Sequence, residues 1–275
     1  MKALLVDGLN LVRRIHAAVP KRNENVDHHS TNNPVETEST HNAADIDGMV
    51  RSSIGSLQRA LKRHTPSHCL VVFEHSGKNW RHRLFPDYKK KRPPVPSDLQ
   101  ALISRFDHAL QNIGITSFSL IGYEADDVIA TMASKISKHQ GQVTILSTDR
   151  NYCQLLDDHI QVYDHFGQRF LDAKMIHDRF QIFPHQLPDL LALAGDGGLS
   201  IPGIQSVGKR TAAKLLNDHG TLENVLEASE NIPGKLGSKL YSGKEDALLA
   251  QRLFTLKQDI ELGINLNQIR YVPTI

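Results

Sequence analysis

Cysteine is scarce in this chain. Only Cys69 and Cys153 occur, and neither belongs to a Cys-x-x-Cys pair. Disulfide scaffolds and zinc sites built from paired cysteines are therefore not indicated. Long apolar runs are also missing, and the N-terminal apolar run is interrupted by Asp7 rather than organised as a signal peptide. We therefore expect a soluble cytoplasmic protein without a membrane partner.

Net charge is also small, because 32 Lys and Arg stand against 30 Asp and Glu, which leaves +2. The total says little about partners, but residues 75–92 carry seven Lys or Arg and one acid. Trp80, Phe85 and Tyr88 lie among these cations. Cations that track phosphates and rings that stack on bases suit single-stranded nucleic acid. The alternative is a solvated loop with a few buried aromatics.

Apolar residues make up 40% of the 275 positions, which is enough for a sizeable core. Four short apolar runs predict buried strands at 2–7, 68–74, 116–124 and 142–149. Helical periodicity lies between them at 48–64, 96–114 and 125–141. Alternating strands and helices predict an α/β fold with a parallel sheet covered by helices. We expect one more strand at 160–165, and only helices and loops after Asp172.

A polar stretch at 21–45 interrupts this pattern. It is rich in Asn, Thr, Glu and His and lacks a periodic apolar face, which predicts a flexible insertion. His28, His29 and His41 lie within it and are potential metal ligands. Because the stretch is expected to be solvated and offers no metal-ligand framework, we expect no metal site there.

Acidic residues end all four predicted strands, and they are Asp7, Glu74, Glu124 and Asp149. In a parallel sheet these ends lie at one edge, where open α/β folds build their sites. Asp126 and Asp127 follow at the start of a predicted helix, where the helix dipole alone favours acids. Carboxylates gathered in one crevice repel one another unless cations offset them. We therefore predict a site there for Mg²⁺ or Mn²⁺, which prefer oxygen ligands.

A metal site next to a basic segment indicates phosphodiester chemistry, because the metal activates water and neutralises charge on the phosphate. A glycine-rich stretch at 191–216 adds another phosphate-binding element. It is nearly a P-loop, but Arg210 replaces the required Ser or Thr and no strand precedes it. A helix–turn–helix fits better, and amides at the start of its second helix would bind phosphate. A plain helical hairpin is the alternative.

Five motifs occur in a characteristic order: LLVDGLNLVRR, VVFEHSGKNWRHRLFPDYKKKRPPVP, EADDVIA, STDRNYCQLL and LAGDGGLSIPGIQSVGKRTA. In this set the chain resembles the 5′-nuclease (flap endonuclease) family, which includes the 5′-nuclease domain of bacterial DNA polymerase I. The likeness is strongest to a short stand-alone bacterial branch. It implies a PIN-like parallel-sheet nuclease core at 1–172, with a helical arch that includes residues 75–99. A helical DNA-binding region with a helix–three-turn–helix follows at 173–275.

The resemblance also implies ligands for two divalent metals. The first site corresponds to Asp7, Glu74, Glu124, Asp126 and Asp127. Glu74 stands there where Asp is usual in the family. The second site keeps Asp149 and Asp196 but has Asn151 and Leu199 where acids are usual. We therefore expect one firm Mg²⁺ site and a second that is weak or depends on substrate.

Contacts to DNA and to K⁺ are implied in the same way. Lys89 and Arg92 match family cations that would stabilise the scissile phosphate. The helix–three-turn–helix would hold K⁺ through the backbone carbonyls of Leu193, Ala194, Pro202, Ile204 and Val207. DNA would be contacted by Tyr88, Ser206, Val207, Gly208, Lys209, Arg210 and Thr211. Ser206 replaces a usual glycine.

The sequence thus predicts a Mg²⁺-dependent, structure-specific 5′-flap endonuclease that acts on branched or flap duplex DNA as a monomer. One alternative is a flap-DNA-binding protein with little hydrolytic activity, because the second metal site is depleted. A PIN-type ribonuclease is a third possibility. The module that grips duplex DNA argues against the ribonuclease.

Overall fold

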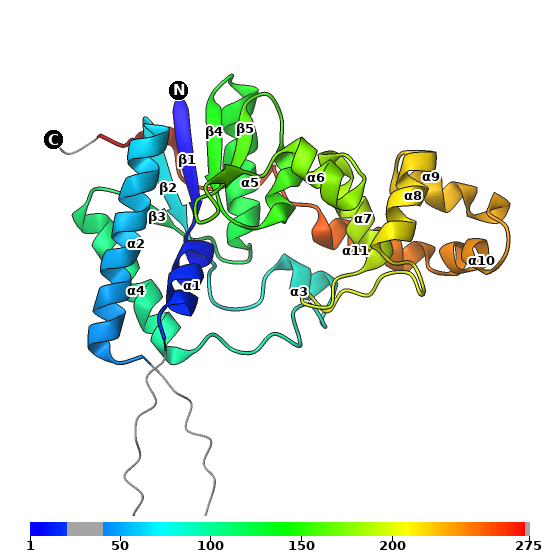
Figure 1. Cartoon of the computed structure of the whole chain (residues 1–275), viewed down its shortest axis with the longest axis horizontal. Coiled ribbons are helices and arrows are strands. Elements are labelled where there is room, and N and C mark those ends of the chain that lie inside the picture. Colours follow the sequence, from blue (N-terminus) through cyan, green and yellow to red (C-terminus); the bar gives the residue numbers. More distant parts are fainter. Residues whose placement is uncertain (21–40, 273–275) are drawn as a thin grey trace, which may run out of the picture.

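A sheet flanked by helices forms one side of the molecule, and further helices extend from it on the other side (Figure 1). The structure is a computed structural model that describes residues 1–20 and 41–272. The described strands, in chain order, are β1 (Lys2–Asp7), β2 (His68–Val72), β3 (Thr116–Phe118), β4 (Gln142–Leu146), β5 (Ile160–Asp164) and β6 (Arg169–Phe170). Side by side in the sheet, they lie in the order β3-β2-β1-β4-β5-β6. The first five run parallel and β6 is antiparallel. The expected parallel α/β sheet is confirmed, including the strand near 160, whereas β6 was not expected.

Strand β1 lies between β2 and β4 and sets the position of the acidic edge. Asp7 pairs with Val72 of β2, and Val6 pairs with Leu146 of β4. The three strands therefore end at the same level. The strand order reverses between β1 and β4, and such a switch point is where open α/β folds place their crevice.

Helices cover both faces of the sheet. Leu4 and Val6 of β1 pack with α1 (Gly8–Ala18), α2 (Ala43–His64) and α4 (Ser97–Asn112). Leu5 points the other way and packs with α5 (Ala125–Lys138). This alternation is the period-two pattern of a strand buried on both faces.

The structure corrects two of the expected boundaries. The strand expected to reach Glu124 ends at Phe118, because Gly122 at φ +84° turns the chain before α5. The expected insertion at 21–45 is too long, since Asn42 already caps α2 through the Asp45 amide. Residues 21–40, with His28 and His29, lie outside the described residues.

Only helices and loops follow β6 among the described residues, as expected after Asp172. The α-helices are α6 (Ala173–Phe180), α7 (Leu187–Ala194), α8 (Lys209–His219), α9 (Leu222–Glu227), α10 (Lys235–Ser242) and α11 (Lys244–Phe254). Short 3-10 turns are η1 (Arg150–Leu155), η2 (Pro184–Gln186), η3 (Ala228–Asn231) and η4 (Leu266–Ile269). Figure 1 shows α8, α9 and α10 extending away from the sheet. The chain then returns to the sheet, where the Tyr271 amide donates to Ser67.

The basic segment between β2 and α4 contains one short helix, α3 (Trp80–Leu84). The rest consists of turns and extended chain, so the helical part of the expected arch is limited to α3. The segment docks on the turn between α7 and α8, because the Lys89 amide donates to the Leu199 carbonyl at 2.9 Å. This contact links the basic segment, which follows β2 of the sheet, to the helical region.

No helix in the described part of the chain combines the length and the apolar character needed to cross a bilayer.

Candidate active site

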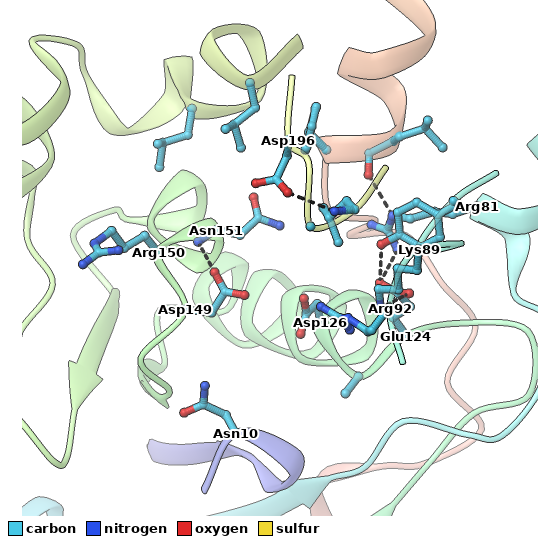
Figure 2. Close-up of a pocket in the computed structure, with 18 of the residues that line it drawn as sticks. Asn10, Arg81, Lys89, Arg92, Glu124, Asp126, Asp149, Arg150, Asn151 and Asp196 are labelled. Atoms are coloured by element: carbon cyan, nitrogen blue, oxygen red, sulfur yellow. Dashed lines mark hydrogen bonds and ion pairs between the residues drawn. The ribbon is translucent and has the colours of Figure 1, made fainter. Parts of the chain in front are cut away.

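One cavity brings most of the predicted acids together with cations (Figure 2). Its acidic lining residues are Asp7, Glu74, Glu124, Asp126, Asp149 and Asp196. Its basic lining residues are Arg13, Arg81, Lys89, Arg92, Arg150 and Lys209. The acids come from the end of β1, the loops that follow β2 and β4, the start of α5, and the turn after α7. The cavity therefore lies at the sheet edge that the strand pattern predicts, and it is shared with the helical region.

Asp7 ends β1 and caps α1, so its carboxylate is held firmly. One oxygen accepts from the Asn10 amide at 2.9 Å, and the other accepts from the Ser147 hydroxyl at 3.0 Å. Burial raises the pKa of Asp7 to about 6, with the Asp149 and Glu74 charges adding to it and these hydrogen bonds opposing it. A buried, partly protonated carboxyl of this kind is stabilised by a cation.

Asp126 is the most crowded of the acids. Burial raises its pKa well above the usual range, and the charges of Asp7, Asp149 and Glu124 raise it further. The hydroxyl of Tyr152 donates to its Oδ1 at 2.6 Å and fixes its orientation. Mutual repulsion among the acids at this point is the condition that a divalent cation relieves.

Glu124 caps α5 and is held by donors on both oxygens. Lys89 Nζ and Asn79 Nδ2 lie 2.5 Å and 2.8 Å from Oε1, and the Tyr88 hydroxyl lies 3.0 Å from Oε2. Burial alone would raise its pKa, but the charges of Lys89 and Arg81 outweigh burial and lower it. Lys89 also contacts Glu74 at 3.2 Å, so its ammonium lies between two of the predicted metal ligands.

Asp127 does not line the cavity, contrary to the expectation that it binds metal. Its side chain is fully buried and accepts from Arg81 Nη1 and Nη2 at 2.6 Å and 2.9 Å. Trp80 Nε1 and the Lys257 amide supply two further donors. Neighbouring helical positions point about 100° apart, so Asp126 and Asp127 reach different surroundings. Asp127 therefore anchors the basic segment and the C-terminal chain to α5.

Tyr88 was expected to contact DNA, but its ring is only 3% exposed and its hydroxyl is bonded to Glu124. It positions Glu124 and is not exposed for stacking on a base. Trp80 is half-buried and similarly tied to Asp127 through Nε1. The aromatic residues in the basic segment thus have structural contacts. Arg92, in contrast, is exposed and lines the cavity.

The positions implied for a second metal also face the cavity. Asp149 caps η1 through the Asn151 amide at 2.8 Å, and Asp196 accepts from the Leu199 amide at 3.0 Å. Asp149 and Asn151 lie after β4, whereas Asp196 lies in the turn after α7 (Figure 2). Leu199 belongs to the same turn as Asp196. The four positions converge, but two of them carry no charge.

The turn between α7 and α8 depends on two glycines. A Cβ on Gly195, whose φ is +75°, would lie 2.3 Å from the Gly203 nitrogen. A Cβ on Gly203 would lie 2.3 Å from the carbonyl carbon of Ala194. The turn also closes through the Ile204 amide, which donates to the Leu193 carbonyl at 2.9 Å. The residues expected to hold K⁺ lie on the arms of this turn.

The predicted DNA-contacting residues begin α8. Gly208 caps this helix without a side-chain hydrogen bond, and Lys209 and Arg210 are exposed. Ser206 adopts φ +67° where glycine is usual, and its hydroxyl lies 2.7 Å from Lys239 Nζ. Lys209 also lines the cavity, so the start of α8 connects the expected duplex-binding surface with the acids.

Four polar residues of the cavity, Asn10, Arg13, Arg81 and Arg150, were not expected from the sequence. Asn10 holds the loop after β4 through Thr148 at 2.9 Å. Arg13 Nε and Arg150 Nε are buried without a hydrogen-bond partner among the described residues. The spacing of Asp7, Asn10 and Arg13 places them on one face of a helix, which would have identified two of them.

Both parts of the chain match models of one nuclease family. Residues 2–181 match the 5′-3′ exonuclease N-terminal resolvase-like domain, and residues 182–274 match its C-terminal SAM fold. The chain belongs to the 5′-3′ exonuclease family. This confirms the resemblance drawn from the motifs, and it makes the protein a nuclease of that family.

Relatives within the 5′-3′ exonuclease family include stand-alone bacterial proteins called flap endonuclease Xni. The one from Photobacterium profundum is 37% identical, with 98% of this chain and 96% of that protein covered. The one from Shewanella frigidimarina is 38% identical, with 99% and 98% covered. A solved structure of the bacteriophage T5 flap endonuclease with DNA and metal ions shares the fold, with a TM-score of 0.70, 21% identity, and 92% and 89% of the chains covered.

Proposed function

We propose that this 5′-3′ exonuclease family member is a structure-specific 5′-flap endonuclease that hydrolyses DNA phosphodiesters at the cavity. The observation that carries the proposal is that one cavity is lined both by acids at the sheet edge and by cations from the basic segment and α8. Acids suit divalent metals, and cations suit phosphates. The names of the bacterial relatives support the same activity.

The acids fit a divalent cation of the Mg²⁺ type. Asp7, Glu124 and Asp126 supply the hard oxygen ligands of one firm site, with Glu74 beside them. Mn²⁺ has the same ligand preference. Bound there, the metal would lower the pKa of a water molecule and neutralise charge on the phosphate. Asp149 and Asp196 offer only part of a second site, which a substrate phosphate would complete.

Cations of the basic segment orient the reacting phosphate. Lys89 is half-buried between Glu74 and Glu124, and Arg92 is exposed at the cavity rim. When the acids bind metal, Lys89 no longer compensates them and its ammonium can contact the phosphate. Arg92 offers a planar guanidinium that binds two phosphate oxygens at once.

The start of α8 binds the duplex next to the phosphodiester that is cleaved. The amides at its N-terminus and the side chains of Lys209 and Arg210 bind backbone phosphates without reading sequence. K⁺ held by the turn at 193–207 would add a fixed positive charge there. Binding to a flap duplex should then be stronger in KCl than in equimolar NaCl. Equal affinity in both salts would remove the K⁺ assignment, because counterion release alone does not distinguish them.

A second function is favoured by one specific observation. Asn151 and Leu199 line the cavity where the family has acids, so the protein would bind flap DNA while hydrolysing it slowly. Cleavage of a labelled 5′-flap duplex in Mg²⁺, Mn²⁺ or EDTA separates the two functions. An endonuclease cuts in both metals and stops in EDTA. Tight binding without cleavage in either metal supports the binding protein, and preferential cleavage of single-stranded RNA contradicts both.

A further inference from the structure

Two histidines and an aspartate meet away from the cavity. His16 lies in the last turn of α1, His41 precedes the cap of α2, and Asp98 lies in the first turn of α4. All three are buried, and their potential metal-ligating atoms lie within 4.8 Å of one another. His16 Nε2 and His41 Nδ1 lie 3.0 Å and 2.8 Å from the same oxygen, Asp98 Oδ2. The sequence placed His41 in a solvated stretch, and the structure corrects that expectation.

The contacts of His41 leave room for a cation in this cluster. His41 Nε2 lies 3.2 Å from the Val19 carbonyl, which can only accept, so a hydrogen bond at this contact places the hydrogen on Nε2. In a neutral imidazole, Nδ1 would then direct a lone pair at the Asp98 carboxylate from 2.8 Å. Two acceptors at that distance repel. Either a proton on Nδ1 or a metal ion bound to it removes the repulsion.

We propose that His16, His41 and Asp98 form a binding site for a divalent transition metal such as Zn²⁺. Two imidazole nitrogens and one carboxylate oxygen are a donor set that suits Zn²⁺, with water as the fourth ligand. The Val19 carbonyl, which accepts from the far nitrogen of His41, is the outer contact that orients metal-bound histidines. Mg²⁺, which prefers oxygen ligands alone, is disfavoured here.

The position of this site indicates a structural role. It joins the end of α1, which begins directly after Asp7, to the start of α4, which follows the basic segment that carries Arg92. Val19 and His41, which lie near the two ends of the described chain on either side of 21–40, meet at the same point. A metal would therefore fasten the exit of the basic segment to the helix that starts at the cavity. This inference does not depend on the proposed nuclease activity.

Thermal unfolding of the full chain tests the site. The protein is stripped with a chelator and kept in excess Mg²⁺, so that the carboxylates of the cavity are occupied. Saturating Zn²⁺ should then raise Tm by about 5–10 °C, as expected for a ligand at a hundred times its Kd. The Asp126→Asn variant should show the same rise, because the cavity is not involved.

Variants of the cluster supply the contrast. His16→Gln should affect folding little, because the glutamine amide can still donate to Asp98. Asp98→Asn removes the negative charge of the cluster. Both should lose the rise in Tm, whereas His108→Gln, an exposed position on the same helix α4, should keep it. Co²⁺ should give a tetrahedral visible spectrum in wild type and in His108→Gln but not in His16→Gln.

Three results would overturn the proposal. The first is a wild-type Tm that does not respond to Zn²⁺. The second is a response that survives in His16→Gln and Asp98→Asn. The third is a Tm that is insensitive to metal and whose fall with rising pH is present in wild type but absent in Asp98→Asn, which would show that the cluster holds a proton instead.

Discussion

At the scale of single residues, adjacent acids in this chain have opposite roles. Asp126 faces other acids in the cavity, and burial with their charges raises its pKa. Asp127 faces Arg81 and is compensated by it. Their positions in the sequence are equivalent, because both fall in the first turn of a helix. Only the three-dimensional partners separate a ligand for a cation from an anchor of the fold.

Asp126→Asn and Asp127→Asn should therefore change stability in opposite directions. Without metal, Asp126→Asn should raise the free energy of unfolding, because it removes repulsion and keeps a partner for Tyr152. Asp127→Asn leaves the buried guanidinium of Arg81 without its charge partner and should cost about 3 kcal/mol. Urea unfolding in EDTA measures both. If Asp126→Asn is the more destabilising change, the assignment of roles is wrong.

Stability should also depend on pH through Asp7, whose pKa is raised to about 6. Folding favours its protonated form, so this contribution is complete below about pH 4 and is lost as pH rises through about 6. The free energy of unfolding should fall by about 3 kcal/mol at most over this range, because the pKa of Asp7 is raised by about two units. Unfolding of wild type and Asp7→Asn in EDTA should show it as a gap that widens from pH 4 to 7. A constant gap would contradict this.

At the scale of elements, apolar runs predicted the sheet well because buried parallel strands need them. They could not predict where the third strand ends, since the turn at Gly122 looks like continuing apolar sequence. The arch was expected to be helical from the resemblance, but only α3 is helical, and Tyr88 in the turns after it is held by Glu124 at the start of α5. The cavity acids at strand ends were predictable, whereas the partners of Asp127 and His41 arise only from tertiary packing.

Substitutions in the basic segment should change the cleavage rate more than the affinity for duplex DNA. Lys89→Ala with Arg92→Ala removes two cavity-lining cations of the basic segment and should lower the cleavage rate, since single transition-state donors contribute ~10²–10³. Duplex affinity should change little, because the start of α8 remains intact. Lys91→Ala is the matched control, being exposed and outside the cavity lining. Loss of binding with an unchanged single-turnover rate would reassign both residues to simple phosphate binding.

At the scale of the whole molecule, the candidate site belongs to both parts of the chain. Asp7, Glu124 and Asp126 come from the sheet region, while Asp196 and Lys209 come from the helical region. The Lys89–Leu199 backbone contact fixes the basic segment between them. The division at 172 and 173 remains a prediction, but neither part alone contains all the acids of the cavity.

Metal binding should reflect this shared construction. The DNA-free protein should bind one Mg²⁺ tightly at Asp126 and a second only weakly, because Asn151 and Leu199 carry no charge. The double variant Asn151→Asp and Leu199→Asp should lower the Mg²⁺ concentration required for cleavage. Calorimetry and metal titration of the rate measure both quantities. Two equally tight sites in the wild type, or an unchanged titration in the double variant, would refute the prediction.

The central claim is that the acids of this cavity direct metal-dependent cutting of 5′ flaps, and a single-turnover cleavage assay tests it most directly. A 5′-labelled flap duplex is mixed with excess wild type or Asp126→Asn in Mg²⁺. Wild type should release the flap near its junction, whereas Asp126→Asn should bind the same duplex and cut it at least ~10²-fold more slowly. Equal cleavage rates for the two proteins, or cleavage by wild type that persists in EDTA, would contradict the account.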